Sequence, residues 1–265
     1  MTPLYALVLA ASVRIGVFGL FHPQELEVRS AAAGATLEIA AGEESQVLRG
    51  GHSARLTSAA KVTGRGGSEA AFVLSVPGKI QREFRGRLEV RRTGESLVAI
   101  VEMDRETAVA SIVGAEAPDA PSEAQKAQAV VARSFLAGSA ARHGDFDFCD
   151  TTHCQFLREP PPAASAPARA AADTRGQAIW YQGRIVAALY SADCGGHTRT
   201  PEQAGWNAES YPYFAVECPI HGPSSGHRIG YCQRGAAELA RRGATFREIL
   251  AHYFPATELA DLKNR

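Results

Sequence analysis

The hydrophobic pattern of this chain changes its period at Asp104, and that change limits the folds it can adopt. Before Asp104, short apolar or β-branched runs are separated by glycine-rich turns, a pattern typical of strands. The clearest runs are residues 13–18, 37–40, 71–76 and 97–101. After Asp104, apolar residues recur at helical spacing. The sequence therefore predicts an α+β protein in which a β-rich N-terminal part precedes a mixed core of helices and strands.

Glycine-rich residues 64–67 and 85–87 are expected to be turns between strands. Asp104 is a suitable N-cap for a first helix that would end at Gly114. A second helix is expected from Ser122, whose side chain would form a capping box with Gln125, to Gly144. Its residues at helical spacing predict a buried stripe of small and apolar side chains: Ala124, Ala127, Val131, Phe135 and Gly138.

The C-terminal half predicts shorter elements. The proline- and alanine-rich residues 160–168 are expected to form a surface segment. Residues 177–181 and 184–190 are typical of two strands joined at Gln182 and Gly183. A helix or helix pair is expected from Ala236 to about Tyr253.

The charge balance argues against a polyanionic partner. The 28 basic and 28 acidic residues cancel, so nucleic-acid binding is not expected. The apolar run at the N-terminus ends near Ala11 and lacks a basic segment before it. It is too short to cross a membrane and does not match a secretion signal, so no membrane span is expected.

All five cysteines lie in the C-terminal half of the chain: Cys149, Cys154, Cys194, Cys218 and Cys232. An odd number leaves at least one of them outside any disulfide framework. Disulfide pairing would suit an oxidising compartment, whereas metal ligation would suit either side of a membrane. Cys218 and Cys232 are close enough in sequence to pair, and Cys194 is a third candidate.

Several motifs, in order, resemble the family of stage II sporulation protein D and the related amidase-enhancer proteins. They are residues 116–133 with the Cys/His loop 149–155, the hairpin 178–190, the loop 191–198, the segment 226–236 and the element 249–255. The resemblance implies a core domain with a Cys/His loop over residues 84–265, preceded by a β-rich accessory region over residues 13–83. The chain departs from the family at Ala117, Gln125 and Arg234, where methionine, leucine and an aromatic residue are usual.

The resemblance implies an enzyme, a lytic transglycosylase that cleaves peptidoglycan between N-acetylmuramic acid and N-acetylglucosamine, in some members only after stem peptides are removed. The muramic C6 hydroxyl closes an anhydro ring, so one carboxylic acid protonates the leaving oxygen and later acts as base. No organic cofactor is expected, and the location implied is extracytoplasmic: periplasm, cell wall or secreted. The alternative is a non-catalytic, glycan-binding activator of a cell-wall amidase.

Two glutamates are candidates for this acid. Glu123 is expected in the first turn of a helix, where the dipole and free amides favour the ionised form. Glu116 is expected in the turn between the two helices, flanked by Ala115 and Ala117, where partial burial would help it to hold a proton. It also matches the position of the family's catalytic glutamate. Glu116 is therefore the predicted acid and base, with Glu123 as the second choice.

Cys149, His153 and Cys154 offer two thiolates and an imidazole within six residues. This set suits three ligands of a tetrahedral Zn²⁺ with an open fourth position, and the resemblance implies a metal at this motif. Asp150 could orient His153. Two alternatives stay open: a Cys149–Cys154 disulfide, and a nucleophilic Cys154 with His153 or His197 as its base.

Sugar-binding residues are expected in two glycine-rich segments, where glycine lets backbone amides approach a ligand. They are Gly195, Gly196, His197, Thr198, His227 and Gln233. A simple turn carrying a structural histidine is an equal alternative for the first segment. Four aromatic residues could stack on sugar faces, although burial in the core is expected for the first two: Trp180, Tyr181, Trp206 and Tyr211.

Overall fold

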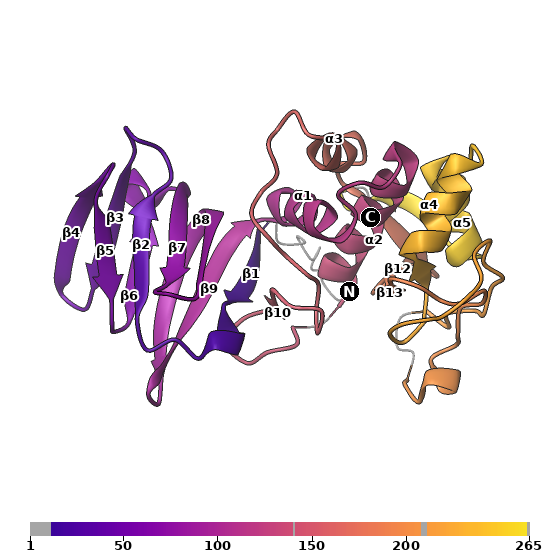
Figure 1. Ribbon diagram of the computed structural model, residues 1–265, viewed down its shortest axis with the longest axis horizontal. Helices are drawn as coiled ribbons and strands as arrows, with labels where there is room; N and C mark the ends of the chain where they lie inside the picture. The colour runs from indigo at the N-terminus through magenta and orange to yellow at the C-terminus, as the bar shows by residue number, and fades with distance from the viewer. Residues whose placement is uncertain (1–11, 140, 208–210, 264–265) are drawn as a thin grey trace, which may run out of the picture. The chain divides into compact units, whose positions relative to one another are not determined.

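A computed structural model describes residues 12–139, 141–207 and 211–263 (Figure 1). The first eleven residues, on which the expectation about a secretion signal falls, lie outside this range. The chain forms two compact units that are interleaved in sequence. Ser12–Glu116 and Ala140–Pro162 form one, called here the strand unit; Ala117–Ser139 and Ala163–Arg265 belong to the other, called the helical unit. The predicted α+β class is confirmed.

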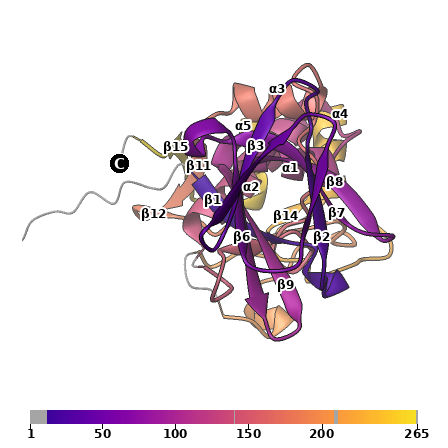
Figure 2. The same cartoon turned by 90° about the vertical axis from the view of Figure 1, so that its left-hand side faces the viewer.

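The strand unit is built on a ten-stranded sheet that curls round on itself (Figure 2). Its order is β10-β1-β9-β8-β6-β3-β4, and β7, β2 and β5 extend from β8. The strands are β1 (Ser12–Val17), β2 (Leu26–Ser30), β3 (Thr36–Ala41), β4 (Glu44–Arg49), β5 (Ser53–Leu56), β6 (Ala60–Thr63), β7 (Ala70–Val76), β8 (Ile80–Thr93), β9 (Ser96–Asp104) and β10 (Phe148–Cys149). Two short 3-10 helices, η1 (Gly19–Phe21) and η2 (Arg65–Gly67), connect them. Each of the four predicted strand runs falls on one of these strands to within a residue.

The turn predicted at residues 85–87 is wrong, because these residues lie inside strand β8. Gly86 is the point at which β8 changes partner: it pairs with β7 up to Gly86 and with β9 from Arg87. Gly86 has a φ of 152°, and a Cβ there would lie 2.1 Å from the carbonyl oxygen of Glu102. Glycine is therefore needed for close backbone approach at a bend, not for a reversal of the chain.

Helix α1 (Arg105–Glu116) packs against β1 and β9 of the strand unit. Its predicted N-cap is confirmed, since Asp104 Oδ1 accepts the amide N–H groups of Glu106 at 3.0 Å and Thr107 at 3.1 Å. The predicted end at Gly114 is wrong. The helix continues to Glu116, so that Glu116 is a helical residue and not part of the following turn.

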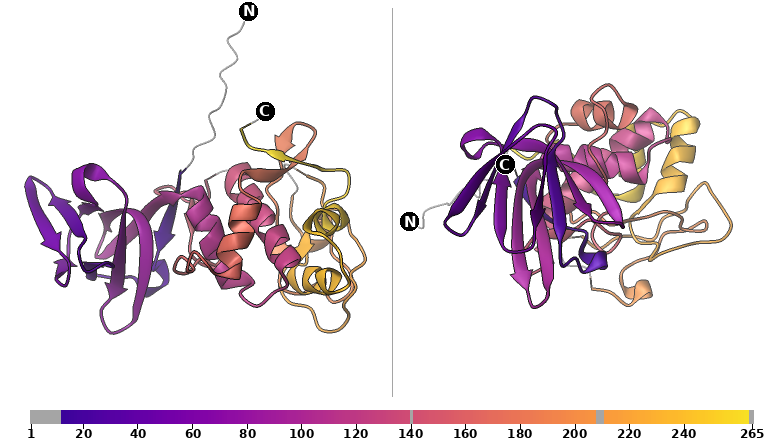
Figure 3. Two further views of the ribbon diagram at one scale, coloured as in Figure 1. Left: turned by 90° about the horizontal axis from the view of Figure 1, so that it is seen from above. Right: turned by 60° about the vertical axis from the view of Figure 1, so that its left-hand side comes forward.

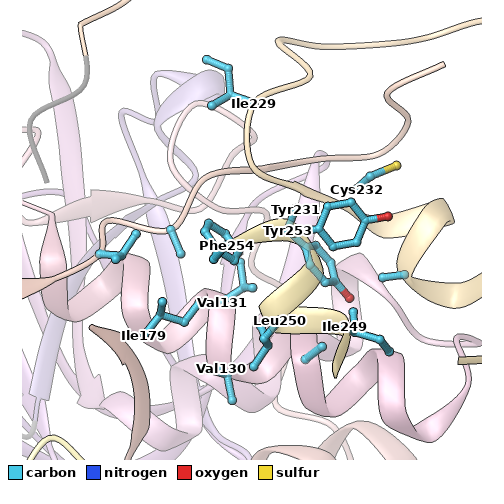
Figure 4. Packing of buried hydrophobic residues seen from close by; sticks show 14 of the residues in the cluster. Val130, Val131, Ile179, Ile229, Tyr231, Cys232, Ile249, Leu250, Tyr253 and Phe254 are labelled. Carbon is cyan, nitrogen blue, oxygen red and sulfur yellow. The ribbon is translucent and has the colours of Figure 1, made fainter. Parts of the chain in front are cut away.

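The helical unit is organised around α2 (Ser122–Gly138), which is packed by α3 (Ala166–Asp173), α4 (Gln233–Arg241), α5 (Phe246–Tyr253) and strand β11. The predicted stripe is confirmed at four positions, because Ala124, Ala127, Val131 and Phe135 are all buried. Figure 4 shows the same core at close range, with Val130 and Val131 of α2 among the cluster that includes Leu250 of α5.

The second helix begins at Ser122, as predicted, but its predicted cap and its predicted end are both wrong. Pro121 occupies the N-cap without a side-chain hydrogen bond. The side-chain amide Nε2 of Gln125 donates to the carbonyls of Ala117 and Pro118 instead of closing a capping box. The helix ends at Gly138 and not at Gly144. A Cβ on Gly138 would lie 2.9 Å from the backbone of Ile185 and Val186, so tertiary packing sets this position.

The remaining elements of the helical unit are short, and two further views are given in Figure 3. They are β11 (Gln177–Tyr181), β12 (Arg184–Ile185), β13 (Tyr190–Ser191), η3 (Glu202–Ala204), β14 (Tyr231–Cys232) and β15 (Glu258–Asp261). The predicted hairpin is confirmed at Gln182 and Gly183, but its second strand stops at Ile185. Tyr190 pairs instead with Tyr231 of β14. The predicted helix pair is confirmed as α4 and α5.

The surface segment predicted at residues 160–168 runs into helix α3, whose N-cap Ser165 accepts the amide of Ala168. Among the described residues, no helix combines the length and apolar character needed to cross a membrane.

Candidate catalytic and metal site

Glu116 is the last residue of α1, where the helix dipole offers no stabilisation to a negative charge. Its Oε1 accepts a hydrogen bond from the backbone N–H of Phe156 at 3.1 Å. Phe156 follows the Cys/His loop by two residues, so this bond holds the candidate acid against the segment that leaves the loop. The bond lies within the strand unit.

Glu123 has a different environment, at the start of α2. Its carboxylate accepts the amide N–H of Phe246 at 2.7 Å and the ammonium of Lys126 at 2.9 Å. Burial by itself would raise the pKa of Glu123, but these two donors outweigh it and hold the pKa below the ordinary value. A carboxyl group held ionised in this way is a poor proton donor, which favours Glu116 as the acid.

The Cys/His loop brings the three predicted metal ligands together, and strand pairing fixes where the loop starts. Cys149 lies in β10, which pairs in parallel with β1 so that Cys149 faces Gly16. His153 Nδ1 lies 3.7 Å from Cys149 Sγ and 3.5 Å from Cys154 Sγ. The loop is closed by the amide of Cys154, which donates to the carbonyl of Thr151.

His143 joins this cluster as a fourth donor that sequence reasoning missed. Its Nε2 lies 3.4 Å from Cys154 Sγ, and its ring stacks on Phe146 with centroids 4.5 Å apart. Burial, followed by the nearby His153 and Arg142, lowers the pKa of His143, which favours the neutral imidazole that binds metals. A histidine six residues before Cys149 was the signal available in the sequence.

The four side chains His143, Cys149, His153 and Cys154 fit a zinc ion. Their ligand atoms all lie within 4.8 Å of one another. Tetrahedral Zn²⁺ with ordinary Zn–S and Zn–N lengths places a sulfur and a nitrogen about 3.6 Å apart. The three nitrogen–sulfur separations given above, 3.4, 3.5 and 3.7 Å, agree with that value. Two thiolates and two imidazoles form a closed set, as in structural zinc sites, in place of the open position expected from three ligands.

Asp150 has a different partner from the one expected. Its carboxylate accepts the guanidinium of Arg82 at 2.9 Å and the amide of Phe18 at 3.4 Å, and both charged side chains are buried. Arg82 also donates to the carbonyl of Leu157 at 2.9 Å. Burial raises the pKa of Asp150, and the neighbouring Arg82 partly offsets that effect. Asp150 therefore fastens the loop to strand β8 rather than orienting His153.

The predicted sugar-binding residues lie in the helical unit. The loop after β13 carries Gly195 and Gly196, both with positive φ, followed by an exposed His197 and a buried Thr198. Arg228, next to His227, donates to the carbonyl of His197 at 3.0 Å, which brings the two predicted segments together. Gln233 begins α4, and its side-chain Nε2 donates to Oε1 of Gln128 at 3.4 Å.

An aromatic pocket of about 910 Å³ lies within the helical unit. It is lined by four aromatic and several polar side chains, together with prolines: Tyr181, Gln182, Arg184, Thr200, Pro201, Glu202, Trp206, Asn207, Tyr211, Pro212 and Phe214. Trp206 and Phe214 are 47% and 42% exposed, and the ring of Trp206 lies 4.9 Å from that of His227. Trp180 is buried, as expected, whereas Tyr181 reaches the pocket. Exposed aromatic faces beside hydrogen-bonding groups are suited to sugar rings.

Comparison with known proteins identifies the segment that carries Glu116 and the Cys/His loop. Residues 93–181 match the family described as Stage II sporulation protein (SpoIID). The resemblance to the stage II sporulation protein D family seen in the sequence is therefore confirmed over these residues. An uncharacterised protein of Brachyspira hyodysenteriae is 31% identical over 124 residues, which are 45% of this chain. The match spans only 34% of the length of that relative.

Proposed function

We propose that this protein is a lytic transglycosylase that cleaves peptidoglycan glycan strands, with Glu116 as its single acid and base. The observation that supports this choice most is the contrast between the two glutamates. Both carboxylates accept a backbone amide. Glu123 lies in the first turn of a helix and is also paired with the Lys126 ammonium, whereas Glu116 is the last residue of a helix. The match to the stage II sporulation protein D family over residues 93–181 supports the substrate class.

The proposed reaction needs no water and no second carboxylate. Glu116 donates its proton to the oxygen between C1 of N-acetylmuramic acid and the following N-acetylglucosamine, and the C1–O bond breaks. The C6 hydroxyl oxygen of the same muramic acid then bonds to C1, and its proton passes to the Glu116 carboxylate. The products are an anhydro-muramic end and a free N-acetylglucosamine end, and Glu116 is again protonated.

The metal proposed on the Cys/His loop would have a structural role and no role in the chemical step. Bound Zn²⁺ would cross-link His143, Cys149, His153 and Cys154 and so stiffen the loop. The chain's own contribution is the Phe156 N–H, which fixes Glu116 Oε1 in one direction. Glycan recognition is assigned to the aromatic pocket and to the segments around His197 and His227. Because the substrate lies outside the cytoplasmic membrane, the proposal also places the protein there.

The test is digestion of purified peptidoglycan, both whole and stripped of its stem peptides by an amidase, with mass spectrometry of the products. Anhydro-muramic products are expected with the wild-type protein and with Glu123→Gln, and they should be lost with Glu116→Gln. Absence of these products from folded wild-type protein would exclude the activity. If glycan binding and stimulation of an amidase survive Glu116→Gln in that case, the protein is an amidase activator.

A further inference from the structure

We propose that Cys194, Cys218 and Cys232 form a second metal site, in which three thiolates of the helical unit bind a thiophilic ion, Zn²⁺ in the first instance. The site does not depend on the proposed function or on the Cys/His cluster, whose residues belong to the strand unit. It replaces the disulfide pairing that the spacing of Cys218 and Cys232 allowed.

The convergence of three sulfur atoms is the first observation. The three Sγ atoms all lie within 4.8 Å of one another, and each cysteine is a free thiol. Tetrahedral zinc places two thiolate sulfurs about 3.8 Å apart, so one ion can contact all three from this arrangement. A disulfide would join two sulfurs and leave the third with no function in the cluster. The three residues are almost fully buried, at 0%, 4% and 0% exposure in chain order.

Hydrogen-bonding groups contact two of the three sulfur atoms of the cluster. Cys232, labelled in Figure 4, is the N-cap of α4, and its sulfur accepts the amide of Gly235 at 3.4 Å. The hydroxyl of Tyr253 lies 3.2 Å from Cys218 Sγ. A helix N-terminus and outer hydrogen bonds of this kind are typical of cysteines that act as metal ligands.

The backbone beside the cluster also leaves room for the sulfur of Cys218. A Cβ on Gly235 would lie 2.2 Å from both Cys218 Sγ and the Tyr253 hydroxyl oxygen. Only glycine can therefore occupy this position at the start of α4 while the sulfur and the phenol keep their places.

The three cysteines lie along a long irregular segment that a bound ion would stabilise. Between β13 and β14, the described residues (192–207 and 211–230) contain only the short η3 and isolated bridges such as that between Asp193 and Ser225. A long irregular segment has a high conformational entropy to lose when it folds. Cys194 lies near its beginning, Cys218 within it and Cys232 just beyond its end. An ion on these three residues would hold the segment in place, as structural zinc does in small domains.

The experiment measures zinc in the full-length chain, purified under reducing conditions and loaded with Zn²⁺ alone. The Cys149→Ser/Cys154→Ser variant removes the Cys/His cluster and leaves the proposed site intact. It should retain about one zinc ion per chain, and its zinc X-ray absorption should show sulfur without imidazole. Changing Cys218→Ser in the same background should remove that ion. Ser191→Ala is the matched control, because Ser191 is buried and pairs with Cys232 but has no sulfur.

A second measurement keeps the proposal testable if Cys218→Ser does not fold. Wild-type protein loaded with zinc is denatured without reductant in the presence of a chelator and alkylated, and labelled cysteines are counted by mass spectrometry. Labelling of all five is expected. A disulfide among Cys194, Cys218 and Cys232, or the absence of zinc from the folded Cys149→Ser/Cys154→Ser variant, would overturn the proposal.

Discussion

The backbone N–H of Phe156 donates to Glu116 Oε1 at 3.1 Å, and this bond joins the end of α1 to the segment leaving the Cys/His loop. A change in the conformation of the Cys/His loop is therefore expected to move the Glu116 carboxylate, although the metal takes no part in the proposed reaction.

Glu116→Gln should remove the acid and leave the fold intact. The glutamine carbonyl can still accept the Phe156 amide, so the melting temperature should change little. Release of anhydro-muramic products should fall by about 10²–10⁴-fold, the usual range for loss of a general acid. The measurement is product release per unit time at fixed glycan, with Glu123→Gln as the control that retains activity. Equal rates for wild type and Glu116→Gln would assign the acid to another residue.

Glu123→Gln should instead change how stability depends on pH. The pKa of Glu123 is held below its ordinary value in the folded protein, after burial is offset by Phe246 and Lys126. Its contribution to stability is therefore complete above the ordinary pKa of 4.5 and is lost as the pH falls through the lower folded value. Urea unfolding should show wild type more stable than Glu123→Gln at pH 7, with the difference shrinking as the pH falls below 4.5.

Removal of the proposed zinc should weaken catalysis without abolishing it. Loss of one ligand in His143→Ala should reduce zinc affinity by more than the about 10–100-fold typical of an outer-shell partner. Activity should then fall in part, because the loop that positions Glu116 loosens while the carboxyl group remains. Competition with a chromophoric chelator measures the affinity. Complete loss of turnover on chelation, with full activity in Glu116→Gln, would point to a metal-dependent hydrolase instead.

Asp150→Ala should be strongly destabilising. It leaves the buried Arg82 guanidinium without its closest carboxylate, and breaking a buried pair on one side costs about 3–5 kcal/mol. Replacing both partners, as Arg82→Met with Asp150→Leu, should cost much less, because no charge stays buried alone. Chemical denaturation of the three proteins measures the difference. Equal stability of Asp150→Ala and wild type would contradict this account.

Gly86→Ala should destabilise the strand unit far more than Gly78→Ala. Both glycines have positive φ, but a Cβ meets the Glu102 carbonyl at position 86 and nothing within 4 Å at position 78. Gly78→Ala should therefore cost only the strain of the backbone, about 1–2 kcal/mol. Gly86→Ala should cost more than this strain, because its Cβ would also displace the Glu102 backbone in strand β9. Similar unfolding midpoints for the two variants would show that the close approach is not needed.

The predictable parts of the fold were those with a clear period or a local cap. Strands such as β7 and the N-cap at Asp104 follow from residues within a few positions of one another. The turn predicted at Gly86 and the helix end predicted at Gly114 are wrong, because glycine is found equally at bends, at close backbone contacts and at turns. Only the position of Glu102 in space distinguishes these cases for Gly86.

The candidate site was predictable where its residues are neighbours in sequence. Cys149, His153 and Cys154 form one short motif, whereas the choice of Glu116 over Glu123 stays a prediction. His143 was missed because its only sequence signal is its place six residues before Cys149, and its contact with Cys154 appears only when the loop folds back. The convergence of Cys194, Cys218 and Cys232 depends on isolated bridges in a segment without periodicity.

Strand β1 has a consequence for the order of folding. Most strand pairs of its unit join neighbours along the chain, such as β7 with β8 and β8 with β9. β1 pairs instead with β9 and β10, so each pairing closes a long loop. Non-local contacts of this kind form slowly. The meander from β2 to β9 is therefore expected to assemble first, and docking of β1 is expected to be a late step that also organises the Cys/His loop.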